Sequence, residues 1–588
     1  VKQALLDAGI STDVYSSYET SLYQPVYSIV AKNSNSKEQD RFVSVINDTL
    51  EKLVKDGINE RTIEAGINYY EFKYREADYG PYPKGLMYYL TMMDSWLYDE
   101  TKPFIHIEAG DTFDELKKNA RNGYFEKLIK EYLLDNNHKS IISLVPEYGL
   151  EKEKEQKEAD KLAEYKSTLT NDELEELVKK TKELKEYQDT PSSQEDLEKI
   201  PMLELSDIKR EPAKDYNDVK SVDGIKIVHH NIFTNKIAYI NMSFDTKCVP
   251  DELIPYMGLL GSTLSLMDTK NYTYPELTNE ININCGGLAT GTALYSDKVD
   301  FSKNTIVYEV KSKALYEKVP FVLGMMEEIM YNTRFDDYKR LKEIIARIKS
   351  RLEASLMGQG HSIAMLECCA QFSESAYYSD ILRGYKYYEF IKKLDEEFEQ
   401  NKTQIVDKLN KLVGYIFNKD NVIVSLTADD EGYDCFVKAL SAKSCNIKDE
   451  HYNTAVRSFI PVNVKTGYTS ASQVQYVARC GNFVKDGYKY TGALKVLKVI
   501  FSYDYLWINV RVKGGAYGCM SGSSRNGDFY MVSYRDPNLE KTNDIYEGAA
   551  DYIRNFNVSR RDMVKFIIGT IGEIDAPLTP SAIGSRSF

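Results

Sequence analysis

The strongest constraint on the fold of this chain is a unit that occurs three times along it. Each unit has the pattern of a glycine turn, a hairpin, a helix and a second helix with a capping residue. The second hairpin strands begin at Val26, Ile306 and Phe529, and the second helices open 32, 29 and 29 residues later. Duplicated domains would keep such spacing, although a common β-β-α-α order could also produce it by chance. We therefore expect an α+β fold built from about two and a half to three tandem copies.

Alternating apolar residues and turn-forming residues define the expected strands, and amphipathic stretches fill most of the chain between them. The chain begins in what resembles the middle of a domain, and no closing strand follows the last helical stretch. Strands are expected at 13–20, 26–32, 140–145, 225–232, 237–244, 305–311, 422–426, 455–459, 472–477, 519–523 and 529–534.

A charged segment at 150–188 separates the first unit from the second. It is dominated by Glu, Lys and Leu, and Thr170 and Glu173 have the spacing of a capping box. We expect two solvated helices joined by a short loop, followed by an extended connection to residue 215. The expected domains are 1–148, a linker at 149–215, 216–428 and 429–588.

Composition narrows the classes of protein to which the chain can belong. With 588 residues the chain is too long for one core, and its formal charge of −14 argues against nucleic acid as a partner. No run approaches the roughly 18 apolar residues of a membrane span. Eight cysteines without CxxC spacing are expected to be reduced, partly buried thiols. They are Cys248, Cys285, Cys368, Cys369, Cys435, Cys445, Cys480 and Cys519.

The stretch RVKGGAYG, residues 511–518, offers a cation and a phenol around a glycine reversal. Gly514 and Gly515 permit positive φ and close backbone approach, which would leave Arg511 and Tyr517 on either side of the turn. A guanidinium binds oxyanions with a planar fork, and a tyrosine hydroxyl is a donor at neutral pH. The pair therefore suits an oxyanion or a peptide carbonyl. On these eight residues alone, the alternative is a hairpin with Arg511 in a surface ion pair and Tyr517 packed on a sheet.

Other candidate sites are weaker. The spacing from Gly286 to Gly291 is that of a phosphate loop, but the required lysine and the βαβ context are absent, so we expect no nucleotide site. His229 and His230 are neighbours on an expected strand and would face opposite ways, which excludes a helix-borne ligand pair. His361 is expected to be a helix-start or core histidine.

Two stretches resemble a known family: LWINVRVKGGAYG at 506–518 and GHSIAMLECCAQFSESAYYSDILRGYKYYEFIKKL at 360–394. Both are similar to the presequence-protease branch of the insulinase-like (pitrilysin) zinc metallopeptidases, and the likeness extends over nearly the whole chain. The resemblance implies four homologous α+β domains in two bowl-like halves, joined by a helical hairpin, that enclose a peptide chamber. The chain would supply a truncated second domain, the hairpin, the third domain and an incomplete fourth, forming the C-terminal bowl.

The resemblance also implies where the chemistry lies. The family's zinc is bound in the first domain by an inverted His-x-x-Glu-His motif and a distant Glu. No histidine of this chain stands in that motif, so we expect no zinc site and no activity of the chain alone. An Arg and a Tyr with the spacing of Arg511 and Tyr517 bind substrate and the tetrahedral intermediate in this family, while Gly514 and Gly515 would shape the turn. The histidines are His106, His138, His229, His230, His361 and His451.

The function predicted from the sequence is therefore the C-terminal portion of a zinc-dependent endopeptidase that degrades unfolded peptides in a closed chamber. Its expected partners are peptide substrates and the N-terminal half of the same enzyme, with no nucleic acid and no membrane, in a cytoplasmic location. The alternative is a catalytically silent peptide-binding or partner subunit that pairs with a separate zinc-bearing chain. A third possibility is a scaffold whose duplicated domains serve protein association.

Overall fold

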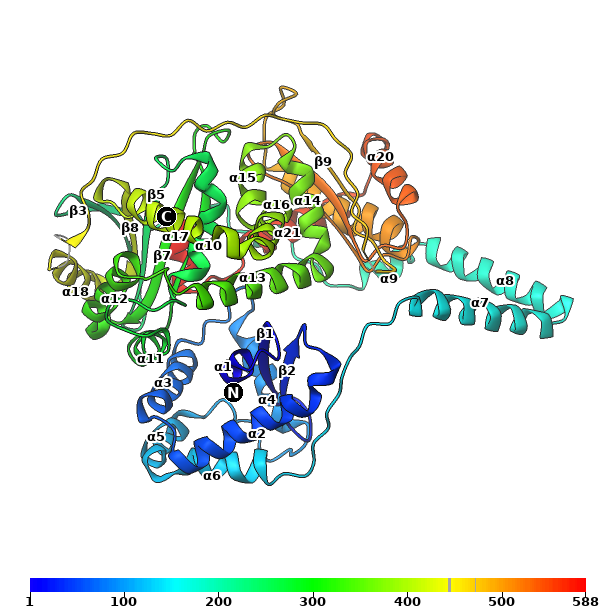
Figure 1. The fold of residues 1–588 in the computed structure, drawn as a ribbon. Helices are drawn as coiled ribbons and strands as arrows, with labels where there is room; N and C mark the ends of the chain where they lie inside the picture. Colours follow the sequence, from blue (N-terminus) through cyan, green and yellow to red (C-terminus); the bar gives the residue numbers. More distant parts are fainter. Residues whose placement is uncertain (443–445, 471) are drawn as a thin grey trace.

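The computed structural model describes residues 1–442, 446–470 and 472–588, and it confirms the α+β class. The N-terminal unit is a two-stranded antiparallel sheet with helices around it, and it lies below the rest of the molecule in Figure 1. Its small core forms around Leu5, Ile10 and Val14. The elements are α1 (Lys2–Asp7), β1 (Asp13–Glu19), β2 (Val26–Lys32), α2 (Gln39–Asp56), α3 (Glu60–Glu76), α4 (Lys84–Trp96), α5 (Gly110–Asn119) and α6 (Tyr124–Leu128).

The strand expected at 140–145 is wrong, because this segment is irregular in the structure. Ile142 is 85% exposed and Leu144 is 98% exposed, so no sheet edge receives these alternating apolar residues. Alternation alone predicts a half-buried strand, but a strand also needs a hydrogen-bonding neighbour.

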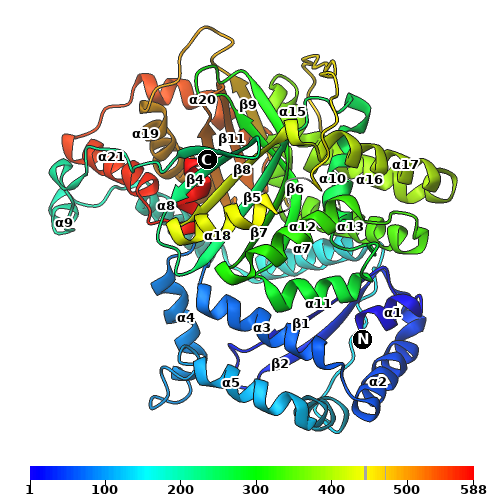
Figure 2. The same cartoon turned by 90° about the vertical axis from the view of Figure 1, so that its left-hand side faces the viewer.

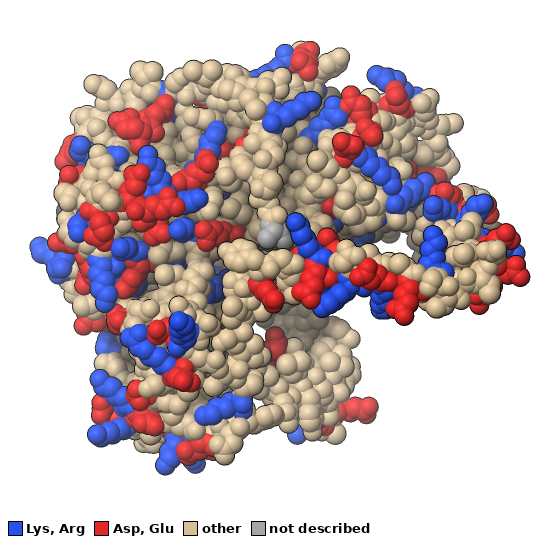
Figure 3. Space-filling model, turned by 45° about the vertical axis from the view of Figure 1, so that its right-hand side comes forward, with Lys and Arg blue, Asp and Glu red and all other residues tan. Residues whose placement is uncertain are grey.

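The linker contains the two expected charged helices, α7 (Leu150–Thr168) and α8 (Asn171–Asp189). Thr170 caps α8: its Oγ1 accepts from the Glu173 amide at 3.3 Å, and the Glu173 carboxylate accepts from the Thr170 amide at 2.8 Å. Neither helix has a buried residue. The pair projects from the body as an arm (Figure 1), and acidic and basic side chains alternate along it (Figure 3). A short helix, α9 (Gln194–Glu198), follows.

The third unit holds the main core, packed on a six-stranded sheet of order β3-β4-β8-β5-β7-β6. Only the β4–β8 pairing is parallel among its described neighbours. The strands are β3 (Asp218–Val222), β4 (Ile225–Asn231), β5 (Ile237–Asp245), β6 (Leu288–Ser296), β7 (Asn304–Leu315) and β8 (Val422–Ala428). The helices are α10 (Ile254–Thr263), α11 (Tyr274–Asn284), α12 (Val319–Tyr331), α13 (Tyr338–Gly358), α14 (Gly360–Ala370), α15 (Glu374–Arg383), α16 (Tyr385–Glu396) and α17 (Phe398–Ile416).

The last unit is a three-stranded sheet of order β10-β11-β9 covered by helices. Two segments pack back onto the six-stranded sheet: Phe436 and Leu440 of α18 join its core, and α22 lies against β8. The elements are α18 (Asp430–Ser441), β9 (Ala478–Asn482), α19 (Ala493–Ile500), π-helical turns at Phe501–Tyr505 and Trp507–Val512, β10 (Gly518–Ser523), β11 (Asp528–Tyr534), α20 (Glu540–Arg554), α21 (Arg560–Ile574) and α22 (Pro580–Ser587).

The strands expected at 455–459 and 472–477 are also wrong. The Ala455 amide donates to the Lys247 carbonyl and the Ser458 amide to Asp251, both at 2.9 Å, so loops of the third unit satisfy this backbone. In the second segment, Gln475 forms only an isolated bridge with Asp536. Both segments are extended, but neither joins a ladder.

The threefold pattern of hairpin, helix and capped helix is present in the structure. The hairpins are β1–β2, β6–β7 and β10–β11, and each is followed by two helices. The second helix of each pair is capped by a side chain that accepts from its first turn: Asn59 for α3, Asp337 for α13 and Ser559 for α21. The spacing in the sequence thus reflects a repeated arrangement of elements.

The N-terminal unit contacts the third unit through α3 and α11, which lie side by side in both Figure 1 and Figure 2. A Cβ on Gly286 would lie 2.1 Å from the Phe72 ring, so the ring packs directly on this glycine. Lys313 reaches across to Glu76, with 2.6 Å between Nζ and Oε2. Within the part of the chain that the structure describes, no helix combines the length and apolar character needed to cross a membrane.

Candidate functional site

The reversal at 513–516 is set by two glycines that act differently. A Cβ on Gly514 would lie 2.4 Å from the Val510 carbonyl oxygen, whereas Gly515 has a φ of +83°. Gly514 therefore allows close backbone approach and Gly515 supplies the left-handed conformation. The sequence assigned both properties to both residues, and the structure divides them. The preceding residues are helical up to Val512, so Arg511 lies at a helix end.

Hydrogen bonds and core packing fix this turn. The Gly515 amide donates to the Arg511 carbonyl at 2.8 Å, and Asn538 Nδ2 donates to the Gly514 carbonyl at 2.6 Å. The Tyr517 amide donates to the Tyr534 carbonyl at 3.1 Å, which joins the turn to β11. Val510 and Ala516 are buried in the core of the last unit. The backbone that carries Arg511 and Tyr517 is thus held on both sides.

The side chains of Arg511 and Tyr517 lie next to each other. Arg511 Cζ is 4.0 Å from the centre of the Trp507 ring and 5.7 Å from the centre of the Tyr517 ring. Tyr517 is 66% exposed and meets Tyr534 edge to face at 5.8 Å. Two aromatic rings therefore flank the guanidinium and orient it, while the phenol stays open to solvent.

Neither polar head is satisfied by the protein. Within the described ranges, the Arg511 guanidinium forms no ion pair or side-chain hydrogen bond, and the Tyr517 hydroxyl forms no hydrogen bond. The surface ion pair of the alternative interpretation is therefore absent from this part of the chain. Together they offer a cation and a neutral donor to one ligand oxygen or to two adjacent oxygens.

The end of the projecting arm reaches this turn. Lys513 Nζ lies 2.7 Å from Asp189 Oδ1, at the last residue of α8. Both side chains are about half exposed, so this contact positions the linker more than it stabilises the fold. At the other end of the hairpin, Gln473 Nε2 donates to Glu151 of α7 at 2.7 Å. Both ends of the arm are thus attached to the last unit.

An aromatic patch continues from Tyr517 onto the third unit. Tyr534 contacts His361 at 4.9 Å between ring centres, and His361 in turn contacts Tyr476 at 6.2 Å. Burial lowers the pKa of His361, and its Nδ1 is buried without a hydrogen-bond partner among the described residues. His361 is the second residue of α14, as expected, but its ring lies beside the candidate site.

Sequence reasoning identified Arg511 and Tyr517 and missed their supports. Trp507 lies four residues before Arg511 on the same helical turn, a spacing that places two side chains on one face. Tyr534 lies opposite Gly518 in the β10–β11 register, so hairpin pairing would have indicated it. Asn538 carries no local signal, because only the tertiary fold brings it to Gly514.

The site has no zinc-binding character. Arg511 is always protonated and cannot act as a ligand, and no carboxylate contacts the pair among the described residues. His229 and His230 face opposite sides of β4: one ring stacks on Tyr433 and the other contacts Phe588. One group with metal-ligand geometry exists in the described ranges, on the outer surface: Asp420, Asp449 and His451, with ligand atoms within 4.8 Å of one another.

The cysteines are free thiols, as expected, in the part of the chain that the structure describes. Cys248, Cys285, Cys369 and Cys519 are buried, and Cys368, Cys435 and Cys480 are half-buried. Cys445 lies outside the described residues. Burial raises the pKa of Cys519, which follows the Arg511 turn, to about 11, so this thiol stays protonated at neutral pH.

Two family models match the chain. One describes the associated domain of M16 peptidases of subfamily C and matches residues 144–394; the other is the "PreP C-terminal domain" and matches residues 467–588. A solved structure of a peptidase M16 inactive domain from Pseudomonas fluorescens aligns with a TM-score of 0.43 at 15% identity, covering 63% of this chain and 86% of that one.

The curated relatives are similar over almost all of the chain. "Protein HypA" of Clostridium perfringens is 40% identical over 98% of this chain and 59% of its own length. "Presequence protease 1, chloroplastic/mitochondrial" of Arabidopsis thaliana is 30% identical over 100% of this chain and 55% of its own length. The chain thus spans less than two thirds of these relatives. The matched domains and relatives assign the chain to the M16 peptidase family, as a C-terminal, presequence-protease-like portion.

Proposed function

We propose that the chain is the C-terminal portion of a zinc-dependent endopeptidase that degrades unfolded peptides in a closed chamber. The observation that carries this proposal is the pairing of Arg511 and Tyr517 on a fixed turn, with both polar heads free of partners in the described ranges. The printed names of the relatives, which include several presequence proteases, support the reaction class. Partners would be peptide substrates and a portion of the enzyme outside this chain.

Arg511 and Tyr517 would act on the peptide bond that is cleaved. Attack on a peptide carbonyl places negative charge on its oxygen, and donors that are already oriented stabilise that charge. The Arg511 guanidinium would bind the substrate backbone or this oxygen, and the Tyr517 hydroxyl would donate a second hydrogen bond. Removal of one such donor in other enzymes costs about 3–4 kcal/mol of transition-state stabilisation.

Gly514 and Gly515 would contribute through shape alone. They bring the helix end and β10 close enough for the two side chains to reach one ligand, and they leave the backbone of the turn open to it. Because Arg511 and Tyr517 do not fit zinc, the ligands for that ion would come from the portion outside this chain. Zinc would supply Lewis-acid activation of water there.

The test is reconstitution with a zinc-bearing N-terminal portion, on one polypeptide or as a second chain. Turnover of a short fluorogenic peptide should appear only with both portions present. In that assembly, Tyr517→Phe should lower kcat by about 10²-fold, the scale expected for loss of one oxyanion donor. Zinc content, measured by atomic absorption, should stay the same.

The matched control is Tyr503→Phe, because Tyr503 is an equally exposed tyrosine, at 64%, on the π-helical segment before the turn. It should leave kcat unchanged. Equal kcat for wild type and Tyr517→Phe would contradict the role of the phenol. Peptide binding by the assembly with no turnover, despite a full complement of zinc, would instead favour the catalytically silent partner subunit.

A further inference from the structure

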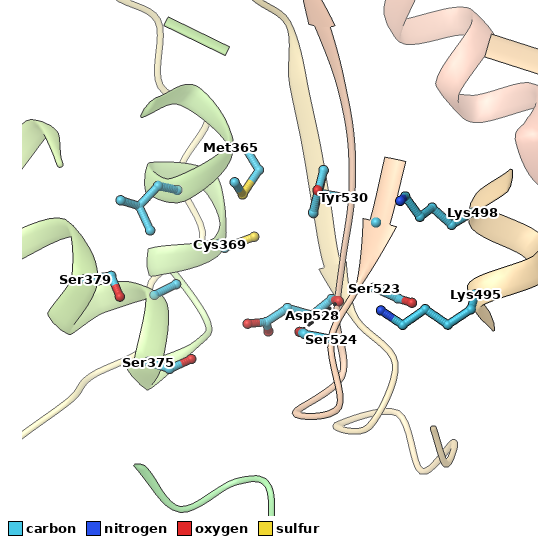
Figure 4. Close-up of a pocket in the computed structure, with 13 residues that line it drawn as sticks. Met365, Cys369, Ser375, Ser379, Lys495, Lys498, Ser523, Ser524, Asp528 and Tyr530 are labelled. Carbon is cyan, nitrogen blue, oxygen red and sulfur yellow. Dashed lines mark hydrogen bonds between the residues drawn. The ribbon is translucent and has the colours of Figure 1, made fainter. Parts of the chain in front are cut away.

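A cavity of about 380 Å³ lies between the third and last units, away from Arg511 and Tyr517. Its walls come from α14 and α15 on one side, the β10–β11 hairpin in the middle and α19 on the other (Figure 4). Tyr517 directly precedes β10 and Ser523 ends it, so the strand, about 20 Å long at 3.3 Å per residue, separates the two places. The volume falls in the range of pockets that hold small ligands.

Opposite charges line this cavity without neutralising each other. Lys495 and Lys498 reach in from α19, and Asp528 lies at the start of β11 (Figure 4). Lys498 is paired with Glu573 at 2.7 Å, whereas Lys495 forms no ion pair within the described ranges. Asp528 accepts hydrogen bonds only from the neutral groups of Asn482, Ser373 and Asn526. One ammonium and one carboxylate thus remain available to a ligand.

The rest of the lining is neutral. Ser523 Oγ is buried and has no hydrogen-bond partner in the described part of the chain, and such a group calls for a ligand or an ordered water. Ser379, in the opposite wall, is only 8% exposed. Between the polar groups, Met365, Leu366 and Ala376 form an apolar surface. The cavity therefore combines two separated charges, hydroxyl groups and room for a short apolar side chain.

We propose that this cavity binds a small zwitterion, a free amino acid or dipeptide with apolar side chains. Its carboxylate contacts Lys495, its ammonium contacts Asp528, and its side chain packs against Met365 and Leu366. The charge pattern favours a zwitterion over a simple anion, because Asp528 would repel a ligand that carries only negative charge. This binding site is separate from the peptidase site and does not depend on the proposed activity.

Isothermal titration calorimetry of the chain tests this proposal with four probes: leucine, leucyl-leucine, N-acetylleucine and leucinamide. We expect saturable binding of leucine or leucyl-leucine, and the tighter of the two identifies which length the cavity takes. N-acetylleucine lacks the ammonium and leucinamide lacks the carboxylate, so each should bind at least about tenfold more weakly, the scale of one charge-assisted hydrogen bond. Equal binding of the capped probes, or no saturable binding of any probe, would overturn the proposal.

Variants assign each charge to its partner. Lys495→Met should weaken leucine binding about tenfold without weakening leucinamide further, because leucinamide has no carboxylate to lose. Asp528→Asn should weaken leucine but not N-acetylleucine. Lys495 is exposed, so its replacement does not threaten folding, and Lys541→Met, an exposed lysine on α20, is the matched control. Unchanged leucine binding by Lys495→Met would reject the site.

Discussion

At the scale of single residues, the reversal at Gly514 determines whether Arg511 and Tyr517 can meet. A methyl group at Gly514 would overlap the Val510 carbonyl, whose position is fixed by the helix end. Gly514→Ala should therefore lower the free energy of unfolding by about 1–3 kcal/mol, measured by urea unfolding. The control is Gly572→Ala within α21, where nothing lies within 4 Å of the added Cβ and alanine should stabilise by up to about 1 kcal/mol. Equal stabilities of the two variants would contradict this account.

Three histidines should make stability depend on pH. Burial lowers the pKa of His229, His230 and His361 in the folded protein from the ordinary value of 6.5. The unfolded chain therefore binds more protons than the folded one as pH falls below about 6.5, so the free energy of unfolding should decrease there. The urea midpoint should be lower at about pH 5.5 than at about pH 7.5. A His229→Gln, His230→Gln variant should show a shallower decrease, and a constant midpoint in the parent protein would exclude this effect.

How far the sequence predicts this site can be followed residue by residue. Arg511, Tyr517 and the two glycines are consecutive enough for local chemistry to indicate them, and their roles stay predictions. Asn538 and His361 come from 24 residues downstream of Gly514 and from another unit, so only the folded chain reveals them. Sequence patterns report on neighbours along the chain, whereas the supports of this site are neighbours in space.

At the scale of secondary-structure elements, the arm formed by α7 and α8 depends on its own local interactions. Because neither helix has a buried residue, the Thr170 capping box is a large part of what fixes the start of α8. Thr170→Ala should cost this helix about 1 kcal/mol, so amide exchange at 171–176 should be about fivefold faster. The urea midpoint of the whole chain should not move.

Thr181→Ala is the matched control for this prediction. Thr181 lies within α8, and its hydroxyl donates back to the Leu177 carbonyl at 2.8 Å without capping the helix. This variant should leave amide exchange at 171–176 unchanged. Protection at α8 that is equally insensitive to Thr170→Ala would mean that tertiary contacts hold the helix.

The same scale explains which elements the sequence predicted. Helices were predicted well because periodicity and caps are local, as at Asn59 and Ser559. Hairpin strands were predicted because both partners are close in sequence. The strands expected at 140–145 and 455–459 failed because pairing needs a remote neighbour, and in the second case loops of the third unit bind the backbone instead.

At the scale of the whole molecule, one partly buried ion pair joins the N-terminal unit to the third unit. The Glu76 side chain is 4% exposed, and its only cationic partner in the described ranges is Lys313, which is about one third exposed. Glu76 also contributes, after burial, to raising the pKa of Tyr239. Lys313→Met leaves the carboxylate buried without its cation. We expect a loss of about 2 kcal/mol, below the roughly 3–5 kcal/mol of a fully buried pair because water screens Lys313.

The control for this interface is Lys339→Met. Lys339 pairs with Asp7 across the same two units at 2.7 Å, but both side chains are exposed. Its loss should cost no more than about 0.5 kcal/mol. Urea unfolding of both variants measures the difference, and equal costs would show that burial of Glu76 does not matter to the interface.

The projecting arm also affects how the molecule moves through solution. A helix of 19 residues with a rise of about 1.5 Å per residue extends about 28 Å from the body. Such an extension adds friction without adding much mass, so the chain should elute earlier in gel filtration than a compact protein of 67.4 kDa. Small-angle X-ray scattering should likewise give a pair-distance distribution with a long tail.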